Sequence, residues 1–379
     1  MYSKNILVVS NAFYPQNSPR SFRTTELVKE LARQGHKVTL YTLENKEIHS
    51  KIGNDIGISI KDLGKLKFKS ISIKNNNKYF SLFKRAISRS LLMLAEYPDV
   101  ELVWRVAKAL NKEQGYDLLI SIAVPYPIHW GVAKAISKNR TLAKTWVADC
   151  GDPYMGDRAD SFRKLFYFKY VEQWFCRKAD YLTVPTAGSV AAYYPEFHSK
   201  IKVIPQGFQF EETPIYEGEI ANEVPCFAYG GGFIPGIRDP RELLEYLCQY
   251  RHPFKFIIYT SNIGMVQPFI AASGNRIEVK SYVPREQLIY ELSKMDFLVN
   301  FTNGTSVQTP SKLIDYAITG RPILNVDTGN LNTDRVNEFL EGTYTNRLEI
   351  KNISAYHIKN VAQQFIDLAG EKQQQEKGR

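Results

Sequence analysis

Short apolar runs alternate along this chain with stretches in which apolar residues recur every three or four positions. Residues 5–10 (NILVVS) and 38–43 (VTLYTL) predict two buried strands. Between them, Ser18 and Pro19 open a predicted helix that runs to about Gln34. A strand, a helix and a second strand within about forty residues predict a right-handed βαβ unit and a parallel sheet.

The same alternation continues through the rest of the chain. Later strands are predicted at 116–123, 180–186, 201–209, 254–261 and 322–326, and another ends at Gly230. The apolar run within 145–157 predicts one more strand, and residues 277–302 predict a strand, a turn, a helix and a strand. Residues 208–224, rich in Glu and Pro, predict a linker. Since 379 residues suffice for two cores, we expect an α/β protein with domains at 1–206 and 207–353. A helix should follow at 354–371, and the polar tail EKQQQEKGR should be disordered.

Composition limits the class of protein. Apolar residues make up 44% of the chain, but no run of about eighteen uncharged apolar residues exists. The first residues show no signal-peptide cleavage pattern. The four cysteines are far apart and form no CxxC pair, which indicates reduced thiols in a cytoplasmic protein. No metal-ligand spacing is present, so we expect neither a metal nor another cofactor.

The formal charge of +10 is concentrated in one segment. No acidic residue occurs from Leu63 to Ala95, and most of the basic excess lies there (Lys65, Lys67, Lys69, Lys74, Lys78, Lys84, Arg85 and Arg89). Apolar residues within it recur at helical spacing (Phe80, Phe83, Ile87, Leu91 and Leu94). Two interpretations stay open: a helix lying on the anionic inner face of a membrane, or an ordinary amphipathic helix packed on its domain. No part of the chain resembles a nucleic-acid-binding module, so we expect no nucleic-acid partner.

Two segments of the predicted second domain suit an anionic ligand. Gly231 and Gly232 follow a strand, where glycines let a phosphate approach the backbone, and Arg238 can pair with phosphate oxygens. In NGTSVQTPSKLIDYAITGRPIL, Thr309 can cap a helix that has Lys312 in its first turn. A cation there opposes the helix dipole, and a bound anion would reverse that penalty. The alternative is a solvated ion pair between Lys312 and Asp315.

The predicted first domain offers two carboxylates where a strand ends. Asp149 and Asp152 follow the apolar run TWVA, and ligands gather at the carboxyl ends of parallel strands. Asp152 can equally cap the turn before Pro153. Arg20 and Arg23 place cations at the start of the first helix, facing either an anionic group or solvent.

These motifs together resemble family 4 of the retaining GT-B glycosyltransferases. The resemblance rests on SNAFYPQNSPRSFRTTELVKELARQGHKVTLYT, DCGDP, IPQGF, SYVPREQL and the PSK…Y…GRP segment. It implies two Rossmann-like, doubly wound parallel-sheet domains with an interdomain cleft, and a terminal helix that returns to the first domain. It also implies a nucleotide-diphosphate sugar as donor and a lipid-linked or glycan acceptor from surface-polysaccharide synthesis.

The resemblance assigns roles residue by residue. The donor diphosphate would lie on the helix that carries Thr309, Ser311 and Lys312, with Asp315 on the ribose hydroxyls. Tyr282 and Val283 would contact the base, and Asp149 or Asp152 would orient the acceptor.

The chain departs from the family pattern at three places. Asn17-Ser18 replaces a glycine pair in the first loop, Gly231 stands where a first Arg is expected, and Val307 replaces the first of two carboxylates. Two alternatives therefore stay open beside a glycosyltransferase. One is a catalytically impaired relative acting as an assembly partner, and the other is a sugar-nucleotide epimerase on the same fold.

Overall fold

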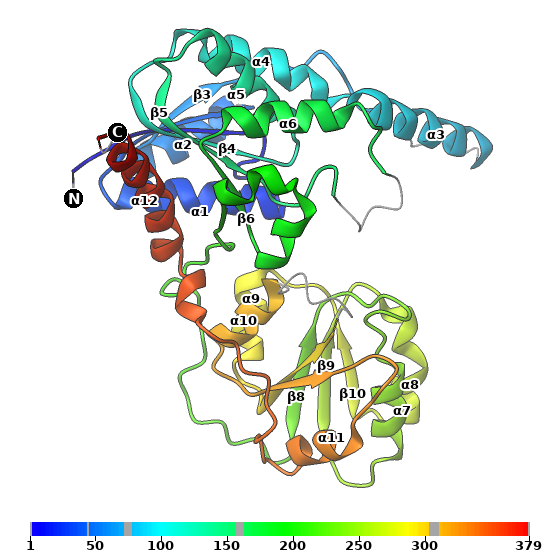
Figure 1. The fold of residues 1–379 in the computed structure, drawn as a ribbon. Helices are drawn as coiled ribbons and strands as arrows, with labels where there is room; N and C mark the ends of the chain where they lie inside the picture. The colour runs from blue at the N-terminus through cyan, green and yellow to red at the C-terminus, as the bar shows by residue number, and fades with distance from the viewer. Residues whose placement is uncertain (1, 44, 72–77, 157–162, 303–310, 378–379) are drawn as a thin grey trace. The chain divides into compact units, whose positions relative to one another are not determined.

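The computed structural model describes residues 2–43, 45–71, 78–156, 163–302 and 311–377. The chain forms two compact units (Figure 1). One consists of Met1–Phe208 with His357–Arg379, and the other of Gln209–Tyr356. The corresponding boundaries expected from the sequence lay at 206/207 and 353/354.

The first unit is built on a seven-stranded sheet in which each described pair of strands is parallel. Its strands are β1 (Asn5–Ser10), β2 (Lys37–Thr42), β3 (Ser59–Asp62), β4 (Tyr116–Ile122), β5 (Ala143–Asp149), β6 (Tyr181–Val184) and β7 (Ile201–Val203). They lie in the order β3-β2-β1-β4-β5-β6-β7. The strand order therefore reverses between β1 and β4, as in doubly wound folds.

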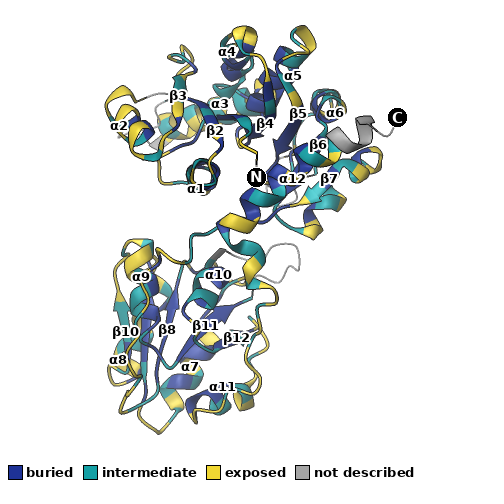
Figure 2. Ribbon diagram, turned by 90° about the vertical axis from the view of Figure 1, so that its left-hand side faces the viewer, coloured by how far each residue is buried: buried dark blue, intermediate teal, exposed yellow. Residues whose placement is uncertain are grey.

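Helices cover both faces of this sheet. The helices of this unit are α1 (Pro19–Arg33), α2 (Lys46–Ile56), α3 (Lys78–Ala95), α4 (Leu102–Ala109), α5 (Pro127–Lys138), α6 (Phe168–Lys178) and α12 (Ile358–Lys377), and all but α3 contribute to this covering. Apolar residues of α1 and α12 pack on one face, and those of α4, α5 and α6 pack on the other. Figure 2 shows the buried residues concentrated on the strands and on the helix faces turned toward them.

The opening βαβ unit forms as the sequence predicts. The Ser18 side chain accepts a hydrogen bond from the Ser21 backbone nitrogen (3.2 Å), and Pro19 is the first residue of α1. Gly35 ends the turn after α1 with φ +83°, a conformation that L side chains rarely adopt. These local signals place α1 beside β1, and parallel pairing of β1 with β2 follows.

The expectation of a disordered polar tail from Glu371 is wrong, because α12 continues to Lys377. Lys372 Nζ pairs with Asp180 Oδ1 at 2.9 Å, and Glu371 Oε2 lies 3.5 Å from Lys202 Nζ. The preceding turns of α12 are buried at Phe365 and Ala369. A helix already held by its apolar face needs only these ion pairs to extend, which composition alone does not reveal.

The second unit repeats the architecture on five parallel strands in the order β10-β9-β8-β11-β12. Its strands are β8 (Cys226–Gly230), β9 (Lys255–Tyr259), β10 (Ile277–Lys280), β11 (Phe297–Phe301) and β12 (Ile323–Val326). Its helices are α7 (Arg241–Gln249), α8 (Gln267–Ala272), α9 (Arg285–Leu292), α10 (Ser311–Ile318) and α11 (Thr333–Leu340). Residues of α7 and α11 line one buried cluster, and residues of α9 and α10 line the other. Here the strand order reverses between β8 and β11.

None of the helices in the described ranges is long and apolar enough to cross a membrane.

We expect α12 to be essential for the stability of the first unit. Phe365 is fully buried, so Phe365→Ala should lower the free energy of unfolding by about 3–5 kcal/mol. All four tryptophans (Trp104, Trp130, Trp146 and Trp174) lie in this unit, so their fluorescence during urea denaturation reports its unfolding alone. Asp367→Ala, on the exposed side of α12, is the control and should change the value by less than about 0.5 kcal/mol. Equal changes in the free energy of unfolding of Phe365→Ala and Asp367→Ala would contradict a stabilising role for α12.

Candidate functional site

The candidate site of the second unit lies where its strand order reverses. The chain leaves β8 through Gly230, Gly231 and Gly232, and the neighbouring strand β11 leads into α10. Gly231 has φ +149°, and a Cβ there would lie 3.1 Å from the Tyr229 hydroxyl oxygen. The loop therefore requires glycine at this position, and it leaves the backbone open for a ligand to approach. In open α/β sheets, ligands bind in this crevice at the carboxyl ends of the strands.

Lys312, in the first turn of α10, is half-buried and has no counter-ion in the described part of the chain. Its Nζ atom is buried and lacks a hydrogen-bond partner among the described residues. It lies 4.3 Å from the centre of the Tyr229 ring and 6.0 Å from that of Tyr316. Burial, and then the charge of Arg238, lower the pKa of Lys312 to about 7. The Lys312 side chain therefore lies against aromatic faces, and no described carboxylate balances the charge of its ammonium form.

Arg238 is the second cation of this site. Its effect on the pKa of Lys312 shows that the two charges interact. The Nε atom of Arg238 is buried and, among described residues, has no hydrogen-bond partner. A tight turn presents this side chain: the backbone nitrogen of Arg238 donates to the Ile234 carbonyl (2.9 Å), and Gly236 adopts φ +72°. Two unneutralised cations beside a glycine loop form an arrangement that an anion would stabilise.

Two tyrosines, to which the sequence assigned no role, hold the glycine loop. The Tyr229 hydroxyl donates to the Gly232 carbonyl at 2.9 Å, and its ring stacks on Phe233 with centroids 4.7 Å apart. The buried Tyr316 hydroxyl accepts from the Gly230 backbone nitrogen at 2.9 Å. Tyr316 follows Lys312 by four residues, so helical spacing alone places both on one face of α10. That spacing was the signal available in the sequence.

Asp315 does not form the solvated pair with Lys312 that the sequence left open. Its partner is Arg285, the first residue of α9, whose Nε and Nη2 atoms donate to Asp315 Oδ1 at 3.0 and 2.5 Å. Burial raises the pKa of Asp315, and the charge of Arg285 opposes that shift. Both bonds end on Oδ1, so neither of them uses Oδ2. Arg285, at the start of α9, thereby joins α9 to α10, and its role is a third one that the sequence did not reveal.

For the other residues predicted to bind the donor, the structure gives only a position in the fold, and that for the described residues alone. Tyr282 and Val283 follow β10, with Tyr282 72% exposed and Val283 packed against the cluster under α9 and α10. Ser311 is the first residue of α10. Thr309, its predicted cap, and Val307 lie outside the described residues. These assignments therefore stay predictions.

In the first unit, Asp149 is buried within an ion pair. Arg23 Nε and Nη2 donate to its two carboxylate oxygens at 2.5 and 2.6 Å, and Thr183 Oγ1 donates to Oδ1 at 2.7 Å. Burial acts to raise the pKa of Asp149, but the charge and hydrogen bonds of Arg23 hold it below its usual value. Arg23 also donates to the carbonyls of Ile204 (3.2 Å) and Pro205 (2.7 Å). The anion that Arg23 faces is therefore Asp149, neither a ligand nor solvent.

This geometry favours a structural role for Asp149, and its proposed contact with an acceptor stays untested. Asp152 is more accessible: its side chain is 60% exposed, and its Oδ2 atom lies 3.7 Å from Arg20 Nη2. The Arg20 guanidinium packs against Gly151, where a Cβ would overlap it. Of the two predicted catalytic carboxylates, only Asp152 can reach a substrate without breaking a buried ion pair.

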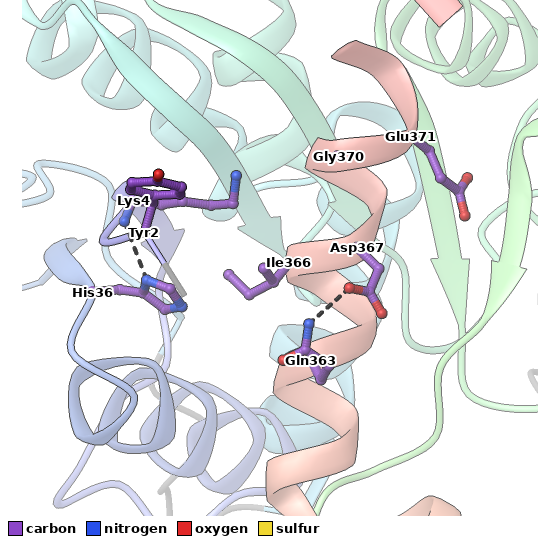
Figure 3. Close-up of a pocket in the computed structure, with 8 residues that line it drawn as sticks. All are labelled: Tyr2, Lys4, His36, Gln363, Ile366, Asp367, Gly370 and Glu371. Atoms are coloured by element: carbon purple, nitrogen blue, oxygen red, sulfur yellow. Dashed lines mark hydrogen bonds between the residues drawn. The ribbon is translucent and has the colours of Figure 1, made fainter. Parts of the chain in front are cut away.

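No group of three or more His, Cys, Asp or Glu side chains suited to a metal occurs among the residues that the structure describes. A cavity of about 440 Å³ opens beside α12 in the first unit (Figure 3). It is lined by Tyr2, Lys4, His36, Gln363, Ile366, Asp367, Gly370 and Glu371. Lys4 and His36 immediately precede β1 and β2, so the cavity lies at the amino ends of these strands, away from the edge where ligands bind such sheets. It is therefore not the candidate site.

No protein-family model matches this sequence, and no curated protein matches it either. Solved structures do match. The lipopolysaccharide outer core galactosyltransferase WaaB is 13% identical with a TM-score of 0.58, covering 97% of this chain and 99% of its own. HepE of Anabaena in complex with UDP is 14% identical with a TM-score of 0.58, covering 99% of both chains. The chain has the GT-B fold.

Similarity at this level of identity establishes the fold alone. A structure from Listeria monocytogenes described as a UDP-N-acetylglucosamine 2-epimerase also matches, with 12% identity and a TM-score of 0.52. The two parallel sheets predicted from the sequence are confirmed. Activity has to be inferred from the site, because the GT-B architecture is shared by proteins of more than one description.

Lys312→Met should stabilise the protein while it has no ligand. A buried ammonium without a partner costs free energy, so removing it should raise the free energy of unfolding by about 1–3 kcal/mol at pH 6. Because the folded-state pKa of Lys312 is about 7, the folded protein loses this proton above pH 7 while the unfolded chain keeps it. The free energy of unfolding of the wild type should therefore rise relative to that of Lys312→Met as pH increases from 7 towards 10. Differential scanning calorimetry at pH 6 and pH 9 measures this, with Lys351→Met, an exposed lysine of the same unit, as control.

Arg23→Met should destabilise the first unit by about 3–5 kcal/mol, because it leaves the Asp149 carboxylate buried without its partner. Arg177→Met removes an ion pair whose side chains are 60% and 50% exposed, and should cost less than about 1 kcal/mol. Tryptophan fluorescence during urea denaturation compares the two. If both variants lost a similar free energy of unfolding, the buried ion pair would stabilise the protein no more than the exposed one.

Proposed function

We propose that this protein is a nucleotide-sugar-dependent glycosyltransferase, which moves a hexosyl group from a nucleoside-diphosphate donor to an acceptor. One observation carries the proposal: Lys312 and Arg238 keep buried, unpartnered nitrogens beside the glycine loop at the strand reversal of the second unit. A diphosphate supplies the negative charge and the acceptor oxygens that this pair lacks. The GT-B fold is consistent with this assignment.

The donor would occupy the second unit from diphosphate to base. Lys312 and Arg238 bind the two phosphates, together with the backbone nitrogens of the glycine loop and of the first turn of α10. Asp315, oriented by Arg285, accepts hydrogen bonds from the ribose hydroxyls through Oδ2. Tyr282 and Val283 contact the base. Arg285 is thereby a positioning residue for the ribose.

In the reaction, charge accumulates on the departing diphosphate as the bond to the anomeric carbon breaks. Lys312 and Arg238 stabilise that charge from fixed positions, so we propose that transfer proceeds without a metal. Binding of the diphosphate also raises the pKa of Lys312, so the ammonium form is present when charge develops. Retention of the anomeric configuration is inferred from the sequence resemblance.

We propose that the first unit holds the acceptor, a lipid-linked saccharide or a growing glycan of a surface polysaccharide. Asp152 is the carboxylate best placed to orient an acceptor hydroxyl, since it is exposed and lies at the carboxyl edge of the sheet after β5. We assign the reaction to the cytoplasm, at the inner face of the membrane.

HepE of Anabaena has been crystallised with UDP-glucose, which makes uridine donors the first to test. UDP-sugars should raise the thermal unfolding temperature of the wild type, with GDP- and CMP-sugars as comparison. Lys312→Met and Arg238→Met should each weaken UDP-sugar affinity by roughly 10- to 100-fold, because each removes a charge-assisted contact worth about 1.5–3 kcal/mol. Arg251→Met, an exposed cation at the amino end of β9, should bind as the wild type does. Isothermal titration calorimetry measures the affinities.

Product analysis separates the alternatives. Sugar transfer that depends on an added acceptor supports the transferase, while conversion of the donor sugar without acceptor would identify an epimerase. If no nucleotide sugar binds to the wild type at millimolar concentration, the proposal fails. The protein would then be better interpreted as an assembly partner without activity.

A further inference from the structure

The helix α3 exposes its apolar face. Phe83, Ile87 and Leu94 lie along the predicted face and are 61%, 38% and 56% exposed, and Leu82 beside them is 50% exposed. No described residue of α3 belongs to any of the four buried hydrophobic clusters. Of the two interpretations left open by the sequence, the exposure of these described residues favours a helix whose apolar face meets a surface outside its own domain. An exposed apolar strip of this kind indicates an interaction surface.

This helix is fixed to the first unit at its carboxyl end. Glu96, which directly follows α3, is buried; it accepts a hydrogen bond from the Tyr154 hydroxyl at 3.0 Å and pairs with Lys164. The Tyr167 hydroxyl donates to the Leu94 carbonyl. Figure 1 shows the rest of α3 projecting outward from the sheet of this unit. Because α3 is held at its carboxyl end, the rest of the helix is available to contact another molecule or a membrane.

Basic residues and aromatic rings surround the apolar face. Arg85 is exposed on α3, and the neighbouring segment exposes Lys65, Lys67 and Lys69. That segment is joined to the base of α3, since the Tyr97 hydroxyl donates to the Lys69 carbonyl at 2.9 Å. Two further rings, those of Phe68 and Phe166, are 42% and 77% exposed near the same base. Aromatic residues with basic neighbours are typical of a membrane–water interface.

We propose that α3 docks this protein on an anionic lipid bilayer. The helix lies in the interface plane, with Phe83, Ile87 and Leu94 among the acyl chains and Lys84 and Arg85 toward lipid headgroups. The absence of any acidic residue from Leu63 to Ala95 favours this occupant over a second copy of the chain. Two copies meeting along α3 would bring like charges together. A nucleic acid would not cover the apolar face.

The test is flotation of the full chain with vesicles of phosphatidylcholine alone and of phosphatidylcholine mixed with phosphatidylglycerol. The wild type should float with the anionic vesicles only, and raised salt should weaken its binding. The double variant Phe83→Ser/Ile87→Ser should lose roughly tenfold or more of the bound fraction, and so should Lys84→Gln/Arg85→Gln. Ile215→Ser, which changes an exposed apolar residue outside α3, should float as the wild type does.

None of the four substituted residues belongs to a buried hydrophobic cluster, and unchanged tryptophan fluorescence in urea verifies that the variants fold. Equal flotation of wild type and variants, or no flotation of the wild type on anionic vesicles, would overturn the proposal. So would a dimer in sedimentation equilibrium that Phe83→Ser/Ile87→Ser dissociates. Flotation needs no nucleotide, so its outcome is independent of the donor-binding result.

Discussion

The central constraint in this molecule is the placement of two half-buried like charges beside one glycine loop. Removing an ammonium and a guanidinium from water is unfavourable, and placing them within interaction range of each other increases the cost. The second unit nevertheless holds Lys312 against Tyr229 and Tyr316 and holds Arg238 in a hydrogen-bonded turn. This electrostatic cost is offset only when an anion binds between the two cations. The parallel sheet supplies the geometry, because its strand order reverses between β8 and β11, where the anion would bind.

The first unit uses the same architecture with the opposite electrostatic outcome. Its first helix also begins with cations, Arg20 and Arg23, near the carboxyl ends of the strands. Here the chain provides the anions itself: Asp149 neutralises Arg23 in the core, and Asp152 lies beside Arg20. This internal neutralisation ties α1, β5 and the segment after β7 together. Among the residues that the structure describes, the strand reversal of the second unit combines a glycine loop with unpaired cations and that of the first unit does not, which is why we place the phosphates in the second unit.

The lipid proposal and the donor proposal describe compatible halves of one reaction. A lipid-linked acceptor lies at a membrane surface, while a nucleotide sugar is water-soluble. A helix such as α3 would keep the first unit at the surface where such an acceptor is concentrated. The apolar side chains of α3 contribute nothing to the described core, so selection for stability of the fold does not account for them.

The sequence alone determined the elements and the candidate chemistry. Apolar periodicity, Ser18 with Pro19, and the glycines at 35 and 320 fixed strands and helices, because these signals act within a few residues. Lys312 was visible as a cation at the wrong end of a helix. What local pattern cannot give is which side chains meet across the fold. Only tertiary structure decided that Asp315 pairs with Arg285, that Asp149 is sealed against Arg23, and that α12 continues through its polar tail. Each of these contacts joins residues at least thirty positions apart, and the energy of such a contact depends on burial that no short segment encodes.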